Sequence, residues 1–387
     1  MKATKIFLSL FAACYSFSSC YAQSFDVGPV TFTPTARLVG GIEYVNNAYK
    51  AGVAGDRTRI ASNQWGTSYF GVGMLVPLTD GFSGIGSLES GFGTDTGETN
   101  DLDGNNTLFN RKANVGLQHD VLGQLTVGTH LFIAQDIEDM DPMAFQSIGL
   151  NTLVNGANDG AAQKSLLYRT ADIYGFNAGY MHQFGGEVGD AERSSSDGFS
   201  LSYAYGGAKI RAIYQKRADN YGRYTGGNFY GLGTQGRWLY VKNTAIAGSY
   251  NFDPVKIFAG YERVEAPDSG HGLSYTFDDK ATMSWAGANY SATDKLTILA
   301  AVYQVKQPYS NKKSDLYAAG INYAFNDYFT VFSTVGYITN NAIAANLVSQ
   351  VGASNHALSY DDVSCKNESD CNGASQLGGY TGVALKF

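Results

Sequence analysis

Hydrophobic and polar positions alternate along most of the chain, in segments of about ten residues that are separated by turns. The final segment, QLGGYTGVALKF, shows the pattern clearly. Leu377, Val383 and Phe387 fall in one nearly apolar row, and Gln376 and Lys386 fall in the smaller, more polar row between them. A period of two residues with one apolar face predicts a β-strand.

The same pattern, followed from end to end, predicts sixteen strands. Their connections alternate between turns of about two to five residues and loops of about seven to 37 residues. The strands are expected at 31–45, 65–77, 82–93, 107–118, 124–131, 164–171, 175–184, 198–205, 208–218, 242–251, 255–264, 281–291, 295–306, 314–324, 328–338 and 376–387.

Short turns on one side and long loops on the other are typical of a transmembrane β-barrel. A soluble all-β protein would show a similar period, but it has no reason to separate its connections by length. A closed barrel has no edge, so the last strand must pair with the first. We therefore expect an all-β fold, a 16-stranded antiparallel transmembrane barrel, with apolar rows facing lipid and polar rows facing the lumen.

The N-terminal segment reads as a secretory signal rather than as part of the barrel. Lys2 and Lys5 precede an apolar run over 6–14, and a small-x-small cleavage site ends the segment. We expect residues 1–22 to be a signal peptide and residues 23–387 to be the barrel domain. Loss of its two lysines would make the formal net charge of −7 two units more negative.

Two cysteines remain in the mature chain, Cys365 and Cys371. In an exported protein an isolated pair at this spacing is most simply a local disulfide, which would contribute roughly 2 kcal/mol through loop closure. The sequence contains no apolar run of 18 residues that would indicate a transmembrane helix.

Several blocks resemble those of the trimeric general-diffusion porins of Gram-negative bacteria. These are SYFGVGMLVPLTDGFSGIGSLESGFGTDTG, LFNRKANVGL, GQLTVG, SLLYRTADIYGFNAGYMHQFG and the terminal GVALKF, in that order. The resemblance implies a homotrimer of sixteen-stranded barrels, each narrowed by a third loop that folds inward. It also implies that the barrel-assembly machinery recognises Phe387, and that outer-membrane lipid and lipopolysaccharide surround the protein.

The third long loop carries clustered acids at Asp136, Glu138, Asp139 and Asp141. In an arbitrary protein this would be a solvated acidic loop. In a barrel too wide to fill with side chains, we expect these acids to lie at the constriction. Asp141 followed by proline also predicts the start of a short helix.

Cations are expected on the wall opposite that loop, with Arg37 and Arg111 as the best candidates and Glu89 also facing the lumen. Three positions where the resembled family usually carries arginine are Tyr69, Gly73 and Thr129 here. Further positive charge on the pore wall is expected from Arg169, Lys209, Arg211 and Arg217. With four loop acids and few facing arginines, the sequence predicts a weak preference for cations.

Enzyme motifs have little support. GLGTQG at 231–236 matches a dinucleotide-binding pattern, but no helix follows it. The histidines lack the spacing of metal ligands. Separately, the segment 341–352 is expected to form a helix in the last outer loop. We expect no enzyme activity, no cofactor, no metal and no nucleic-acid partner.

The sequence thus predicts an outer-membrane porin of a Gram-negative bacterium, a water-filled channel through which small hydrophilic solutes and ions diffuse passively. The alternatives are a substrate-specific porin and, from another class, an outer-membrane adhesion or enzyme barrel.

Overall fold

The computed structural model describes residues 24–50, 53–99, 107–153, 160–218, 240–265, 280–307, 311–341 and 375–387. The expected signal peptide, both candidate disulfide cysteines, Cys365 and Cys371, and the GLGTQG segment lie outside these residues. So does the helix expected over 341–352, apart from its first residue. These expectations remain predictions.

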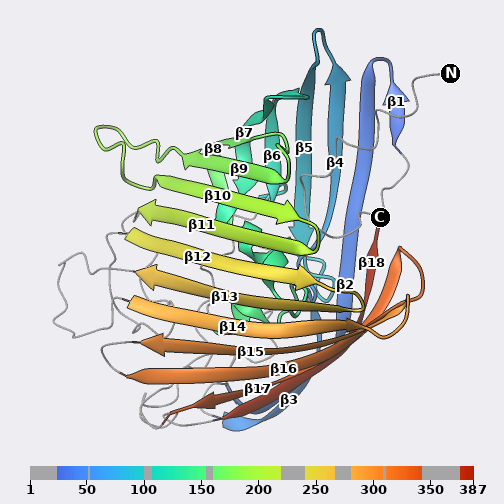
Figure 1. The fold of residues 1–387 in the computed structure, drawn as a ribbon, viewed down its shortest axis with the longest axis vertical. Helices are drawn as coiled ribbons and strands as arrows, with labels where there is room; N and C mark the ends of the chain where they lie inside the picture. The colour runs from blue at the N-terminus through green and yellow to red at the C-terminus, as the bar shows by residue number, and fades with distance from the viewer. Residues whose placement is uncertain are drawn as a thin grey trace.

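Strands dominate the described chain and follow one another around a single antiparallel sheet (Figure 1). The first half contains β1 (Phe25–Val27), β2 (Val30–Lys50), β3 (Val53–Ser62), β4 (Ser68–Pro77), β5 (Phe82–Phe92), β6 (Lys112–His119), β7 (Gly123–Leu131), β8 (Ala161–Arg169) and β9 (Phe176–Gln183). The second half contains β10 (Ser196–Tyr205), β11 (Ala208–Ala218), β12 (Tyr240–Asn251), β13 (Val255–Glu265), β14 (Lys280–Ser291), β15 (Leu296–Gln307), β16 (Lys312–Ala324), β17 (Phe329–Asn340) and β18 (Gln376–Lys386).

Two short helices lie between β7 and β8. They are the 3-10 helix η1 (Ile133–Met140) and the α-helix α1 (Leu150–Leu153). Among the described residues, no helix has the length and apolar character needed to cross a membrane.

The sheet closes on itself as the sequence predicts. Strand β18 pairs with β17 on one side and with β2 on the other. At the seam, the backbone N–H of Ala36 donates to the carbonyl of Phe387 over 2.9 Å, and the N–H of Phe387 donates back over 3.0 Å. Closure gives the backbone groups of both end strands partners, which is the condition for a sheet in hydrocarbon.

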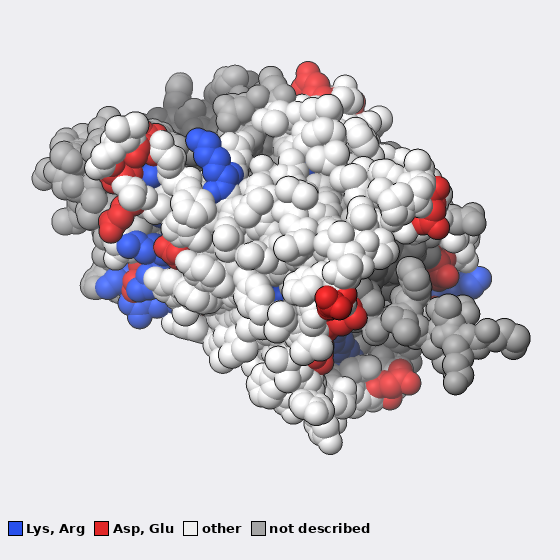
Figure 2. All heavy atoms as spheres, turned by 90° about the horizontal axis from the view of Figure 1, so that it is seen from above, with Lys and Arg blue, Asp and Glu red and all other residues white. Residues whose placement is uncertain are grey.

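The two rows of the closing strand face opposite sides of the barrel. Leu377, Val383 and Phe387 are exposed on the outside, whereas Gln376 and Tyr380 are buried inside. The same alternation runs through the neighbouring strands and leaves large apolar side chains exposed around the outer surface. Figure 2 shows a broad white area without charged side chains across the middle of one face. The outer surface is therefore suited to lipid.

The second strand in barrel order, next to β2, differs from the prediction. Strands β3 and β4 both pair with β2, so they share one place in the barrel and are separated by an inward break at residues 63–67. Asn63 and Gly66 have φ values of 65° and 68° there, which interrupts the extended backbone. Counting β3 and β4 together, and β1 as a short addition to β2, the described strands form a 16-stranded barrel.

Individual strand boundaries also shift. The expected strand over 65–77 begins at Ser68 after the break, and the one expected from residue 107 begins at Lys112. The segment 53–62, which lies between two expected strands, forms β3; charged and small residues interrupt its apolar row.

The connection between β7 and β8 folds into the barrel, as expected of the third loop. We call its described part, residues 132–153, the inner loop; in Figure 1 it lies behind β11–β13. Ile137, Met140, Met143 and Ile148 of this loop are fully buried in one apolar cluster with side chains from the wall. Complete burial of such a side chain stabilises by about 1.5–3 kcal/mol, so the loop is firmly packed rather than loosely suspended.

Candidate functional site: the inner loop and the facing wall

Hydrogen bonds fix the course of the inner loop along the wall. Near its start, the N–H of Ala134 donates to Gln215 Oε1 of β11 over 3.0 Å. Further on, Trp285 Nε1 of β14 donates to the Met140 carbonyl over 3.0 Å. Close packing continues at Gly287, where an added Cβ would lie 2.5 Å from Pro142 Cβ. The loop therefore follows β11 to β14 with side-chain and backbone complementarity.

The far end of the loop is held by Gln146. Its Nε2 donates to Asn322 Oδ1 over 2.8 Å, while its Oε1 accepts from the Tyr380 hydroxyl over 3.1 Å and from the Thr334 hydroxyl. One buried amide thus links the loop to β16, β17 and β18.

The loop also reaches the break between β3 and β4. Trp65 Nε1 donates to the Ala144 carbonyl over 2.8 Å, and the N–H of Ser147 donates to the Gln64 carbonyl over 2.7 Å. The inward break missed by the strand prediction is therefore a docking point for the loop.

The helix expected after Asp141 does not form. The Asp141 carboxylate accepts the N–H of Met143 over 3.0 Å, as an N-cap would. However, Ala144 and Phe145 have φ values of 55° and 69°, so the chain leaves helical conformation after one turn. The helical turns lie on either side, at η1 and α1.

Asp136 and Asp139 meet cations from the nearby wall. Arg169 Nη1 and Nη2 donate to the two oxygens of Asp136 over 2.8 and 2.9 Å. Arg211 bridges both acids, at 3.1 Å from Asp136 and 2.9 Å from Asp139, and Lys209 lies 2.5 Å from Asp139. Burial would raise the pKa of Asp136, but Arg169 and Arg211 outweigh it and hold that pKa below its ordinary value. The five residues form a compact ionic cluster.

Asp141 is buried in a different environment. The Tyr303 hydroxyl and the N–H groups of Met143 and Leu150 donate to its carboxylate. Burial raises the pKa of Asp141 to about 6, although these hydrogen bonds oppose the change. This carboxyl therefore ties the loop to itself and to β15.

Glu138 is the loop acid on the side of the opposite wall. Its Oε1 accepts from Asn151 Nδ2 over 3.3 Å, and its charge lies within electrostatic reach of Arg37.

Arg37 and Arg111 both lie close to the ring of Tyr69. Their guanidinium carbons lie 5.4 and 4.8 Å from the centre of the Tyr69 ring. Arg37 is also 6.0 Å from the ring of Phe145 in the inner loop, and its Nε donates to the Thr67 carbonyl over 2.9 Å. Tyr69, one of the positions that lacks the family's arginine, thus lies within cation–π distance of two other arginines.

Glu89 pairs with two cations on the same wall, at 3.3 Å from Arg111 Nε and 2.6 Å from Lys112 Nζ. The sequence interpretation did not include Lys112. It also omitted Arg57 and Arg59 of β3, which each lie 2.9 Å from the buried Glu43 carboxylate of β2. Their spacing of two residues was a usable signal, because it places both side chains on one face of a strand.

Eight of the predicted pore residues fall into two groups, to which Glu138 and Asp141 do not belong. Asp136, Asp139, Arg169, Lys209 and Arg211 form the ionic cluster beside β8 and β11. Arg37, Arg111 and Glu89 gather around Tyr69 and Lys112 on the wall formed by β2, β4, β5 and the start of β6. Phe387 lies on the outer surface at the seam, where its predicted role in assembly remains a prediction.

The chain is similar in sequence to known porins. The profile of a family described as Gram-negative porins matches residues 9–343. An outer membrane porin protein of Bordetella pertussis is 26% identical over 215 residues, which are 51% of this chain and 51% of that protein. The chain thus matches about half the length of that relative.

Solved structures share its fold. An anion-selective porin from Comamonas acidovorans has a TM-score of 0.72 at 17% identity, over 92% of this chain and 100% of that one. The trimer form of OmpT from Vibrio cholerae has a TM-score of 0.66 at 14% identity, over 92% and 99%. OmpF of Salmonella typhi, in complex with daunomycin, has a TM-score of 0.61 at 17% identity, over 94% and 100%. With a closed barrel, an inward-folded loop and a profile match across most of its length, the chain belongs to the Gram-negative porins and to the outer membrane.

Proposed function

We propose that this porin is a passive, water-filled channel for small hydrophilic solutes and ions, and that it works as a homotrimer. The observation that carries the proposal is the packing of the inner loop against only part of the wall. Apolar contacts, hydrogen bonds and ion pairs hold it to β8, to β11–β18 and to the break after β3, while arginines gather on the facing wall. A barrel of this strand number is wide enough to leave an aqueous passage between the two.

The channel would then select solutes by the size of that passage and ions by the electric field across it. The family and the fold indicate a channel rather than an enzyme. The trimeric relative supports the proposed assembly.

We further propose a weak preference for anions, in place of the weak cation preference expected from the sequence. Asp136 and Asp139 are each paired with cations of the ionic cluster, and the buried Asp141 carboxylate accepts hydrogen bonds from Tyr303, Met143 and Leu150. Described inward-facing cations outnumber the carboxylates. The cations include Arg37, Arg57, Arg59, Arg111, Lys112, Arg169, Lys209, Arg211, Arg217 and Lys256, and the carboxylates include Glu43, Glu89, Asp136, Glu138, Asp139, Asp141 and Glu262.

The similarity to an anion-selective porin supports the proposed preference for anions. Because salt screens charges over about 10 Å at 0.1 M, the preference should be strongest in dilute electrolyte.

Liposome swelling tests the general channel against its alternatives. Proteoliposomes are placed in isotonic solutions of neutral sugars of increasing size, and swelling rates are compared with those of empty vesicles. A general porin gives rates that fall smoothly with solute size and do not saturate. Saturation with one solute would instead indicate a substrate-specific porin, and no swelling with any solute would leave an adhesion or enzyme barrel.

A further inference from the structure

Cationic side chains form a band along one end of the barrel's outer surface. Lys306 of β15 is exposed on the same face as Val302, and Lys313 of β16 shares its face with Tyr317. The two lysines stand directly opposite each other in the β15–β16 register. Neighbouring strands continue the band with Lys216, Lys242, Arg263 and Lys280.

Two carboxylates lie within this band on the described strands β11–β16. Glu265 is 3.0 Å from Lys242 and also pairs with Arg263, and Asp315 is 2.9 Å from Lys313. Six cations against two acids leave an excess of positive charge at the boundary of the apolar surface. Such a band attracts anionic groups at a membrane surface.

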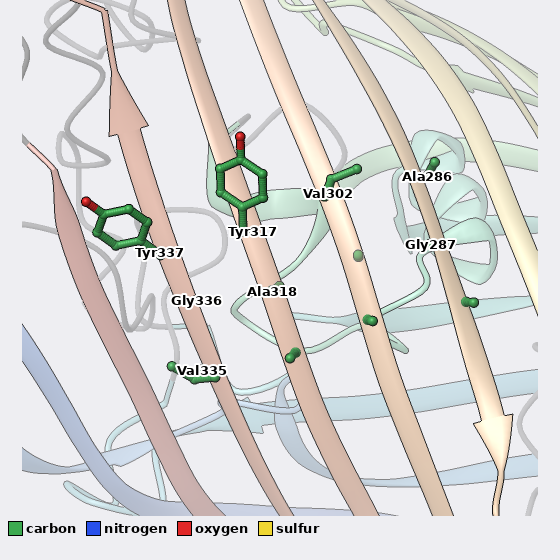
Figure 3. A pocket seen from close by; sticks show the side chains of 12 residues that line it. Ala286, Gly287, Val302, Tyr317, Ala318, Val335, Gly336 and Tyr337 are labelled. Carbon is green, nitrogen blue, oxygen red and sulfur yellow. The ribbon is translucent and has the colours of Figure 1, made fainter.

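An apolar hollow of about 580 Å³ lies next to the band, on the outer face of β14–β17. Its floor consists of small side chains, including Ala286, Ala300 and Ala319, and Tyr317 and Tyr337 stand side by side at one end (Figure 3). The small residues follow one another in register across the strands, so the hollow is built by the pattern of the sheet.

The register also gives the distance between the hollow and the lysines. Val302 pairs with Tyr317 at the hollow, and Lys306 pairs with Lys313 four residues along the same strands. At about 3.3 Å per residue, the lysines lie about 13 Å from the hollow. Between them is a polar row in which Gln304 Nε2 donates to Asp315 Oδ1 over 2.6 Å. Along the strands, the apolar hollow is followed by the polar row and then by the lysines. A phosphorylated lipid has its acyl chain, linker and phosphate in the same order.

We propose that the outer face of β14–β16 binds a phosphorylated lipid of the outer leaflet, with an acyl chain in the hollow and a phosphate against Lys306 and Lys313. This site rests on the proposed outer-membrane channel and specifies one of its lipid contacts. A second copy of the chain fits less well, because a symmetric contact through this face would place like-charged lysines opposite one another.

Native mass spectrometry of the detergent-purified trimer tests the site, with bisphosphorylated lipid A as the probe. The Lys306→Gln, Lys313→Gln double variant should bind it about thirtyfold more weakly, since one lysine near a membrane surface contributes about fivefold. Lys295→Gln, at the other end of β15, is the matched control and should bind normally. Equal binding by the double variant and the control would overturn the phosphate contact.

The hollow is tested separately by Ala300→Phe, with Ala212→Phe on the outer row of β11 as the control. Filling the hollow should weaken lipid binding about tenfold, and the control should not. Inorganic phosphate should fail to compete with the lipid at equal concentration; equal competition would mean that only a headgroup is recognised. Each variant is also checked for channel conductance. Unchanged conductance with unchanged lipid binding would refute the lipid site alone, whereas a wild-type trimer that does not conduct would refute the channel.

Discussion

Replacing Asp136 by Asn removes a charge that holds the inner loop to β8 and β11. The Asp136 side chain is 6% exposed and receives both terminal nitrogens of Arg169, with Arg211 at 3.1 Å. Asn keeps the shape but leaves two partly buried guanidinium groups facing a neutral amide. Losing one partner of a buried ion pair costs about 3–5 kcal/mol. Because Arg211 keeps Asp139 at 2.9 Å, we expect the lower end, about 3 kcal/mol.

The half-life of the folded trimer in SDS at a fixed temperature is a suitable assay, since unfolding of such assemblies is governed by a rate. If the cluster is lost in the transition state for unfolding, 3 kcal/mol shortens the half-life by up to about a hundredfold. The same substitution should shift the reversal potential toward anions, because it uncovers positive charge. Asp56→Asn is the control: that exposed carboxylate accepts from Tyr44 on the outer surface over 2.7 Å.

A second substitution separates the ion pair from a general packing effect. Adding Arg169→Gln to Asp136→Asn removes the cation that has lost its contact with the Asp136 carboxylate and should restore part of the lost half-life. If Asp136→Asn behaves like Asp56→Asn in both half-life and reversal potential, the Asp136 ion pairs do not hold the inner loop to the wall.

Three further predictions concern pH, assembly and the disulfide. Because burial raises the pKa of Asp141 to about 6, its contribution to folding is fully present below its ordinary pKa of 3.8 and is lost as the pH rises through about 6. The SDS half-life should therefore increase on acidification from pH 7 to 5, and Asp141→Asn should flatten that change; an unaltered pH profile in the variant would argue against it. Deleting Phe387, whose backbone is bonded across the seam, should lower the yield of folded trimer in the outer membrane without reducing export, as measured by fractionation and immunoblotting. Normal yield would count against its role in assembly. Mass spectrometry of freshly isolated protein should find Cys365 bonded to Cys371, and two free thiols would disprove the disulfide.

The barrel could be predicted from the sequence because its strands are half-exposed to lipid. In β15, for example, Ile298 and Val302 face outward, whereas Leu299 and Tyr303 face inward. The alternation with a period of two residues can therefore be recognised in the amino-acid sequence. The closing strand was predictable for the same reason. Strand β3 was not, because Arg57 and Arg59 alternate there with small or polar residues and the chain then breaks at Asn63.

The sequence indicates which charged residues belong to the site, but not which of them form ion pairs with one another. The loop acids and most of the wall cations named from the sequence have their side chains inside the barrel, and their role at the constriction remains a prediction. Their partners depend on where a 3-10 turn points each side chain, which a cluster of acids does not encode. Asp136 and Asp139 thus face Arg169 and Arg211 rather than standing unpaired, and the proposed change from a weak cation preference to a weak anion preference rests on this pairing.

We propose that the channel is open to water and that the cations of the facing wall set the electric field across it. Reversal potentials of single trimers in a planar bilayer, measured across a dilute KCl gradient, test it most directly. We predict stepwise conductance, a reversal potential on the anion side that fades as salt rises, and a shift toward cations in Arg37→Gln, Arg111→Gln. A trimer that does not conduct, or one that is cation-selective in dilute salt and unaffected by loss of these arginines, would contradict the account.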